Sequence, residues 1–323
     1  MDIPQDLKAN AERLTEGYSQ ALLRKTAQNL SDRYRNDSGA GKKLCTEDIE
    51  AAVYSLVRMP ATYGAVSDAI NYALEYYDGE PIKTLLDVGA GTGAASWAVS
   101  DLLTLDSITC LEREAAMRNV GSELMLGGSD VLQRAKWIEA DLISSNNLCS
   151  ADLVIESYVL NEMSATNRNL TVEKLWNSCN RMLILVEPGS KPGFNVIKEA
   201  RSQLLKLGAH IIAPCPHEDK CRLESDDWCH FTCRVQRSKI HRLLKDGDVP
   251  YEDEKYSYIA AVHSDSDCRR ASSRILRHPY IDKGQVRVEL CSTDSNSTVT
   301  IRKRDGDIYK SVRKAKQGDS LSY

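Results

Sequence analysis

Apolar residues in the first part of the chain recur at spacings of three and four, the period of an α-helix buried on one side. The pattern runs through Leu14, Tyr18 and Leu22 and returns over residues 53–57. No strand-like alternation of apolar and polar residues interrupts it. The sequence therefore predicts an N-terminal helical cap over residues 1–80.

From Thr84 onward the pattern changes to short apolar runs separated by helix-length segments. The runs are TLLDV, SITCLE, KWIEA, DLVIES and MLILVE, followed by HIIAP and YSYIAAV. Apolar runs that alternate with helices are typical of βαβ units and of a doubly wound parallel sheet. We therefore expect an α/β domain of Rossmann-like architecture over residues 81–268, with a further helix near 236–244.

The last part of the chain, residues 269–323, has a third pattern. Its short β-like runs GQVRVELC, STVTIRK and DIYKSV are separated by Asp, Asn, Ser and Gly, which favour turns. This pattern predicts a small, β-rich antiparallel appendix after the α/β domain.

Composition narrows the class of protein. The chain has 323 residues, of which 42% are hydrophobic and 27% charged, and no apolar run approaches the roughly 20 residues of a membrane span. The opening, MDIPQDLKANAERL, has neither the basic and apolar parts of a signal peptide nor an Arg-rich transit pattern. We expect a cytoplasmic, monomeric protein with no membrane partner.

The net charge of −4 hides an asymmetry along the chain. From Arg269 to the end there are 13 Lys and Arg against 6 Asp and Glu, so this part carries +7 and the preceding residues carry −11. A basic segment suits the phosphates of a nucleic acid, although a solvated β-ribbon explains the charge equally well. The candidate phosphate contacts are Arg302, Lys303, Arg304, Arg313, Lys314 and Lys316.

A glycine-rich string, LLDVGAGTGAASWAV, joins the first predicted strand to a helix. Its glycines are spaced G-x-G-x-G with an acidic residue before them, not G-x-G-x-x-G as in dinucleotide-binding loops. The string resembles the first motif of class I S-adenosylmethionine-dependent methyltransferases, which implies a backbone bordering the amino-acid part of that cofactor. A tight turn without a ligand is the alternative.

Two acids complete the predicted cofactor site. Glu112 ends the second strand, 19 residues after Gly93, where a carboxylate can accept hydrogen bonds from ribose hydroxyls. Asp141 follows the third strand and would contact the adenine amino group, or else cap a helix. The candidate residues around the cofactor are Asp87, Gly89, Ala90, Gly91, Gly93, Glu112 and Asp141.

Residues that act on the methyl acceptor would lie at the carboxyl end of the fourth strand, which faces the methyl group of the cofactor in this fold. The string IESYVLNEM supplies weak catalytic candidates, with a glutamate as general base or as a buried helix cap. It has no Asn-Pro-Pro-Tyr motif and no cysteine nucleophile. These candidates are Glu156, Tyr158, Asn161 and Glu162.

Cysteines gather after the sheet. The string APCPHEDKCRLESDDWCHFTC has the spacing C-x5-C-x7-C, too open for a zinc knuckle. Soft thiolates from a loop suit a [4Fe-4S] cluster. Spacing alone does not separate this from zinc held by four cysteines, or by three cysteines with His217 or His230.

Several strings, in order, match one family. They are SDRYR, YSLVRMPATYGAV, LLDVGAGTGAASWAV, ESYVLNEM, LVEPGSKPGFNVI, APCPHEDKC, WCHFTCRVQR and RKAKQGD. Over nearly its full length the chain resembles the methyltransferase-like proteins associated with the mitochondrial small ribosomal subunit, and their bacterial relatives.

The resemblance implies a set of metal ligands, a partner and roles for the other cysteines. It implies a [4Fe-4S] cluster on Cys215, Cys221, Cys229 and Cys291. Cys233 lies outside the family pattern and Cys268 has no counterpart in it. We expect the remaining cysteines to be core residues, namely Cys45, Cys110, Cys149 and Cys179. The implied partner is the small ribosomal subunit with its 16S-type rRNA.

Three functions remain open at this point. The first is a cofactor-binding, iron-sulfur factor that acts on the small ribosomal subunit in assembly or translation. The second is an rRNA methyltransferase with turnover, and the third is a small-molecule methyltransferase with structural zinc. The missing catalytic signature in ESYVLNEM favours the first.

Overall fold

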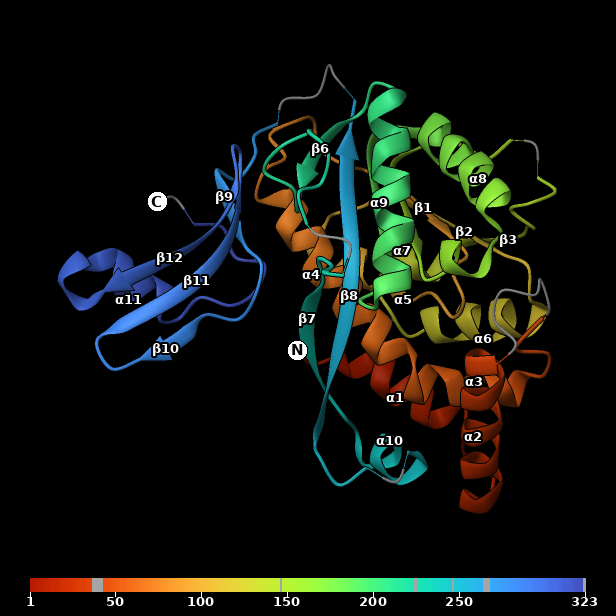
Figure 1. Cartoon of the computed structure of the whole chain (residues 1–323). Coiled ribbons are helices and arrows are strands. Elements are labelled where there is room, and N and C mark those ends of the chain that lie inside the picture. Colours follow the sequence, from red (N-terminus) through yellow and green to blue (C-terminus); the bar gives the residue numbers. More distant parts are fainter. Residues whose placement is uncertain (37–42, 146, 224–225, 246, 264–267, 322–323) are drawn as a thin grey trace.

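The computed structural model of the chain describes residues 1–36, 43–145, 147–223, 226–245, 247–263 and 268–321. A large mixed sheet lies between helices, and a small antiparallel sheet lies beside it at the C-terminal end (Figure 1). Within these ranges, no helix combines the length and apolarity needed to cross a bilayer.

The large sheet has the strand order β3-β2-β1-β4-β5-β8-β6, with β7 also paired to β8. The first five strands are parallel, and β8 runs antiparallel to β5, β6 and β7. Its strands are β1 (Thr84–Val88), β2 (Ser107–Glu112), β3 (Lys136–Glu139), β4 (Ala151–Ser157), β5 (Cys179–Pro188), β6 (His210–Ala213), β7 (Phe231–Gln236) and β8 (Tyr251–Val262). This arrangement confirms the predicted α/β fold with a doubly wound sheet.

The central strands β1, β4 and β5 are buried on both faces, which is why they are apolar runs rather than alternating ones. Leu85 belongs to the core on one face and Leu86 to the core on the other. Trp97 of α5 packs in the first core and Ile197 of α9 in the second. The helices of the α/β part are α5 (Ala94–Leu102), α6 (Ala115–Met125), α7 (Asp130–Gln133), α8 (Ala165–Ser178), α9 (Lys191–Lys206) and α10 (Lys239–Leu244), with the 3-10 turn η1 (Leu160–Glu162).

The N-terminal segment is helical, in the form of α1 (Gln5–Arg13), α2 (Gln20–Asn36), α3 (Asp48–Val57) and α4 (Met59–Leu74). Nearly every residue of α4 is buried, and this helix packs against α5 and β8. A helix that is apolar all round has to be covered on every side. Because α4 shares the core of the sheet, part of the N-terminal cap belongs to the layer that covers the sheet.

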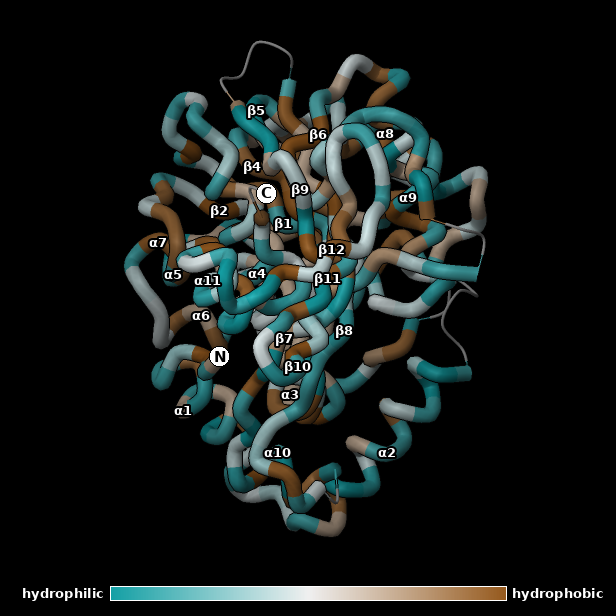
Figure 2. The backbone as a smooth tube through the Cα atoms, turned by 60° about the vertical axis from the view of Figure 1, so that its left-hand side comes forward, coloured by the Kyte–Doolittle hydropathy of each residue, from teal (hydrophilic) through white to brown (hydrophobic). Residues whose placement is uncertain are grey.

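The small sheet has the order β10-β11-β12, with β9 also paired to β11, and every pairing is antiparallel. It has its own core, in which Val286, Val288 and Ile301 pack with Tyr309. Figure 2 turns this sheet toward the viewer. Its elements are β9 (Ser273–Ile275), β10 (Tyr280–Asp282), β11 (Gln285–Ser292), β12 (Asn296–Arg302), η2 (Lys303–Asp305) and α11 (Asp307–Val312).

One predicted strand is a helix. The run DIYKSV forms α11, and its two buried residues, Tyr309 and Val312, are three positions apart. That spacing places both side chains on one face of a helix, toward the core of the small sheet. The prediction of a strand was wrong because it relied on the β-propensity of a six-residue run, which packing overrides.

Arg274 in β9 joins the small sheet to the rest of the molecule. Its side chain is 1% exposed. Nε donates to the carbonyl of Pro214 at 3.2 Å, and one guanidinium nitrogen donates to that of Gly318 at 2.9 Å. The guanidinium also lies 5.2 Å from the ring centroid of Tyr76 in the N-terminal segment. One buried cation therefore contacts three distant segments.

We predict that Arg274→Met lowers the free energy of unfolding by about 3 kcal/mol, because two hydrogen bonds from a charged donor are lost in a buried place. Urea unfolding measures the change. The matched control is Arg269→Met, which removes a surface ion pair with Asp78 whose side chains are 66% and 45% exposed, and it should cost much less stability than Arg274→Met. Equal losses in the two variants would contradict the role given to Arg274.

Candidate functional site

The glycine loop after β1 turns the chain sharply toward α5. Gly89 has a φ of +69° and Gly91 a φ of +55°, a region that residues with a Cβ seldom adopt. A Cβ on Gly89 would lie 2.4 Å from Cγ2 of Val159. The N–H groups of Gly89 and Ala90 donate to the carbonyl of Leu111, at 2.9 and 3.0 Å. The loop is therefore fixed on the end of β2.

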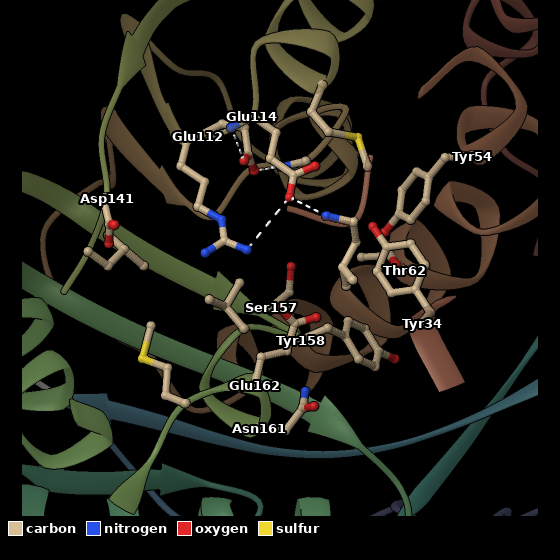
Figure 3. A pocket seen from close by; sticks show the side chains of 18 of the residues that line it. Tyr34, Tyr54, Thr62, Glu112, Glu114, Asp141, Ser157, Tyr158, Asn161 and Glu162 are labelled. Atoms are coloured by element: carbon tan, nitrogen blue, oxygen red, sulfur yellow. Dashed lines mark hydrogen bonds and ion pairs between the residues drawn. The ribbon is translucent and has the colours of Figure 1, made fainter. Parts of the chain in front are cut away.

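A cavity of about 260 Å³ lies at the carboxyl ends of β1, β2 and β4 (Figure 3). Four predicted cofactor residues line it: Gly89, Gly91, Glu112 and Asp141. The Glu112 carboxylate accepts the N–H of Gly91 at 2.9 Å and that of Glu114 at 2.8 Å. Burial raises the pKa of Glu112. Asp141 accepts a backbone N–H two residues further on, at 2.9 Å, and so caps the turn after β3.

The other predicted cofactor residues do not line the cavity. Asp87 is fully buried, and its carboxylate accepts the N–H and the hydroxyl of Ser96 at 3.0 and 2.7 Å. Burial raises its pKa to about 6. Gly93, with a φ of +88°, is the N-cap of α5, and Ala90 is buried. These residues hold the loop and α5 together beneath the cavity.

The N-terminal helices form a wall of the cavity that the sequence did not predict. Glu114 accepts the N–H groups of Leu44 and Cys45, at 2.9 and 2.7 Å, and so ties the segment before α3 to the end of β2. The strings SDRYR and YSLVRMPATYGAV, which carry part of the family resemblance, contain four of the wall residues. Neither string indicates the contact with Glu114, which joins segments about 70 residues apart. The lining residues from this part are Tyr34, Leu44, Tyr54, Arg58 and Thr62.

Two weak catalytic candidates after β4 are held by structural partners. Tyr158 has a φ of 63° and is the only non-glycine residue with a positive φ in the described ranges. Its hydroxyl donates to Glu254 at 3.0 Å. Asn161 donates from its side-chain amide to Glu187 at 2.6 Å. Both residues line the cavity, and neither polar end is free of a protein partner.

The two glutamates of this segment differ. Glu156 is fully buried and does not line the cavity, and it accepts the N–H groups of Val159 and Leu160, at 2.7 and 3.0 Å. Burial raises the pKa of Glu156. Burial also raises the pKa of the neighbouring Glu187, and the Glu156 carboxyl raises it further. Glu162 lines the cavity, and burial raises its pKa to about 7. Glu156 thus fits the role of a buried cap, and Glu162 is the glutamate that faces the cavity.

The four cysteines predicted as metal ligands line one second cavity of about 50 Å³. Cys215 and Cys221 come from the loop after β6, Cys229 from the end of that loop and Cys291 from β11. Burial raises the pKa of Cys215 and Cys229, and that of Cys291 to about 12, and neighbouring thiols raise all three further. The structure therefore brings together cysteines separated by up to 76 positions.

Two buried arginines, Arg201 and Arg274, line the same cavity. Both lower the pKa of Cys215, opposing the effect of burial. Nε2 of His217 lies 3.7 Å from Sγ of Cys291. Over the ranges that the structure covers, no three Cys, His, Asp or Glu side chains form a group that could hold a single metal ion.

The cysteine loop contacts both parts of the molecule. Trp228, beside Cys229, donates its indole N–H to the carbonyl of Gly189 at 3.0 Å. Arg222, beside Cys221, donates to the carbonyl of Ser292 in β11 at 3.0 Å. The loop therefore lies between the large and small sheets.

The remaining cysteines lie outside this cavity. Cys233 is buried on β7. The backbone of Cys268 forms an isolated antiparallel β-bridge with that of Tyr77. Cys45, Cys110 and Cys179 are buried, as expected for core residues. Cys149 is exposed, so its prediction as a core residue was wrong. It precedes β4 in a polar loop where no core reaches it.

The predicted phosphate contacts are all exposed, but they form two groups. The first group, residues 302–304, lies at the end of β12 and in η2, and the second, residues 313–316, follows α11. Nζ of Lys316 lies 6.0 Å from the ring centroid of Tyr72, so the second group is near the N-terminal helices.

A family model described as "Mitochondrial small ribosomal subunit Rsm22" matches residues 48–322. The human protein "Ribosome assembly protein METTL17, mitochondrial" is 26% identical over 288 residues, which cover 83% of this chain and 62% of that one. The Schizosaccharomyces pombe "Rsm22-cox11 tandem protein 2, mitochondrial" is 26% identical over 285 residues, which cover 73% of this chain and 38% of that one. The chain thus spans less than two thirds of each of these relatives.

Solved methyltransferases are similar at lower identity. Magnesium protoporphyrin IX methyltransferase from Synechocystis aligns with a TM-score of 0.42 and 14% identity, over 77% of this chain and 99% of that one. The N-methyltransferase NodS from Bradyrhizobium japonicum aligns with a TM-score of 0.44 and 10% identity, over 74% of this chain and 99% of that one.

We predict that Glu162→Gln stabilises the protein more at high pH than at low pH. The Glu162 carboxyl has a pKa of about 7 in the folded protein and an ordinary value of 4.5, so the folded state holds this proton more tightly. Stability is lost as the pH rises from about 4.5 through 7, and the glutamine removes that loss. The gain should be about 2 kcal/mol larger at pH 8.5 than at pH 5 by urea unfolding.

The control is Glu173→Gln, at an exposed glutamate of α8. It should change stability equally at the two pH values. A pH-independent effect of Glu162→Gln would contradict the assignment.

Proposed function

Because the chain belongs to the Rsm22 family of mitochondrial small ribosomal subunit proteins, we propose that it is a methyltransferase-like factor of the small ribosomal subunit. In this proposal it binds S-adenosylmethionine, carries a [4Fe-4S] cluster and contacts 16S-type rRNA during assembly or translation. The observation that carries the proposal is the cavity bordered by the glycine loop, Glu112 and Asp141 at the carboxyl ends of the parallel strands. In open α/β sheets, ligands bind at this edge.

The charge of this cavity supports S-adenosylmethionine. The cofactor has a sulfonium and an ammonium group against one carboxylate, so it is a net cation. The acids that line the cavity outnumber the basic residues Arg58 and Arg113, and they are Glu112, Glu114, Asp141 and Glu162. A cationic ligand would offset the cost of bringing these carboxylates together.

The side chains after β4 support a binding role rather than turnover. Tyr158 and Asn161 each donate to a glutamate of the protein, and Glu156 caps backbone N–H groups. A general base has to reach the acceptor. Glu162 is the cavity-lining glutamate of this segment that remains for such a role.

The gathering of four cysteines at the second cavity supports the proposed cluster. Cys215, Cys221, Cys229 and Cys291 would hold it, and Arg201 beside them favours the thiolate form that metal binding needs. When bound, the cluster would cross-link the loop after β6 to β11, so metal binding would contribute to folding. Zinc on three cysteines and His217, which lines the same cavity, is the alternative, and it would require these side chains to draw closer together than they are in the described residues.

The basic C-terminal segment supports the ribosomal partner. All six predicted phosphate contacts are exposed, and the segment from Arg269 onward carries a net charge of +7. A human relative is named as a ribosome assembly protein. Exposed Lys and Arg side chains can bind phosphates and release the counterions around them.

We predict that Glu112→Gln weakens binding of S-adenosylhomocysteine at least about tenfold, because one charged acceptor is lost where the ribose hydroxyls would lie. Isothermal titration calorimetry measures the affinity. The matched control is Glu139→Gln, at an exposed glutamate that ends β3 and pairs with Arg118, and it should leave the affinity unchanged. Equal affinities for wild type and Glu112→Gln would refute this cofactor site.

We predict that Cys221→Ser lowers iron content and protease resistance together, because the cross-link between the loop and β11 is lost. Protein purified without oxygen should hold about four irons per chain in the wild type, by elemental analysis. The control is Cys149→Ser, at an exposed cysteine away from the cavity.

Two results would count against this proposal. Stoichiometric zinc in the wild-type protein would favour the small-molecule methyltransferase with a structural zinc. An unchanged proteolysis pattern in an iron-free Cys221→Ser would show that the cluster does not hold the small sheet.

A further inference from the structure

The small sheet has two different faces. Val286, Val288 and Leu290 of β11 point into its core, and α11 covers that side. The alternate residues of β11 point to the other side, and two of them, Arg287 and Glu289, are exposed. The loop after β6 lies at the Cys291 end of this face, whereas the end at Arg287 is exposed and available to a partner.

An exposed tyrosine and an arginine lie side by side on this open face. Tyr280 is 61% exposed and lies on β10, the edge strand. It is directly opposite Arg287 of β11, whose guanidinium carbon is 4.9 Å from the ring centroid. Thr300 of β12 is opposite Arg287 in turn, and Arg302 lies two residues further along β12. We name Tyr280, Arg287, Thr300 and Arg302 the Tyr280 face.

Stability of the fold does not account for this pair. A ring left 61% exposed gains little from burial. In the part of the chain that the structure describes, the Tyr280 hydroxyl has no hydrogen-bond partner and Arg287 forms no ion pair with a carboxylate. The carboxylates on the same face are Asp282 and Glu289.

The surroundings of the Tyr280 face are basic. Lys283, Lys303 and Arg304 are exposed at the end of the sheet where Arg302 lies. They belong to the segment of net charge +7, whereas the rest of the chain carries −11. A polyanion is therefore drawn to this end of the molecule.

We infer that the Tyr280 face binds an unpaired stretch of RNA. One base stacks on the Tyr280 ring, and the flanking phosphates contact Arg287 and Arg302. This inference rests on the proposed function, in which the partner is rRNA. An aromatic ring on an open sheet favours a single strand, because bases in a duplex are stacked on one another and cannot reach it.

The test is fluorescence anisotropy with the cofactor-loaded full chain and a labelled oligouridylate of about twelve nucleotides. Tyr280→Ala should weaken binding at least about fivefold, the loss of one stacked base, and Tyr280→Phe should retain affinity. The salt dependence should be unchanged in Tyr280→Ala, whereas Arg302→Gln should lower its slope by about 0.7. Thermal unfolding checks that each variant is folded.

Two matched controls are available. Ile281→Ala removes a neighbouring apolar side chain that is 51% exposed but lies on the opposite face of β10. Tyr18→Ala removes a tyrosine that is 47% exposed, far away in the N-terminal segment. Neither variant should change RNA affinity.

The outcomes separate this inference from the proposed function. If the wild-type protein binds no RNA, the proposed rRNA partner fails and the inference fails with it. If RNA binds and Tyr280→Ala binds as tightly as the wild type, the stacking inference alone is overturned. If polyglutamate binds as tightly as the RNA and depends equally on Tyr280, the face is a protein-binding surface and the inference is also overturned.

Discussion

Two neighbouring carboxylates at the end of β2 hold the walls of the larger cavity together. Glu112 accepts the N–H of Gly91 and so fixes the glycine loop, and Glu114 accepts the N–H groups of Leu44 and Cys45 and so fixes the N-terminal helices. Burial raises the pKa of Glu112, and the neighbouring carboxylate of Glu114 raises it further, so this pair of acids is held at a cost. The two carboxylates that fix the shape of the cavity therefore also make its lining acidic.

Much of the fold was predictable because helices and strands each leave their own spacing of apolar residues in the sequence. The central strands β1, β4 and β5 are buried on both faces and appear as apolar runs, from which they were predicted. The edge strand β3 was predicted from the run KWIEA although most of its residues are exposed. The failure at α11 has the opposite cause, since six residues are too few to show a period before the packing of Tyr309 and Val312 is known.

The site was predictable where its residues follow directly on predicted strands, because the position along the sequence then fixes the position in space. Gly89, Gly91 and Glu112 lie at the ends of adjacent parallel strands, which meet at one edge of the sheet. Asp87 lies beside them in sequence, but it points into the sheet's covering layer toward Ser96. The tyrosines and Arg58 of the N-terminal wall lie in strings that match the family, SDRYR and YSLVRMPATYGAV. Their place at the cavity was not predicted, because they reach it only through tertiary packing. For the cysteines, spacing left zinc and iron-sulfur open, and the resemblance singled out Cys291.

The strand β11 places Arg287 and Cys291 on the same face, four residues apart. Side chains in a strand alternate with a strict period of two, so inserting or deleting one residue between them would turn one of the two toward the core. The other residue would stay on the original face, so Arg287 and Cys291 would no longer lie on the same side of the sheet. The length of this short segment is therefore as constrained as the identity of its residues, and natural variation in the small sheet should be confined to the loops between its strands.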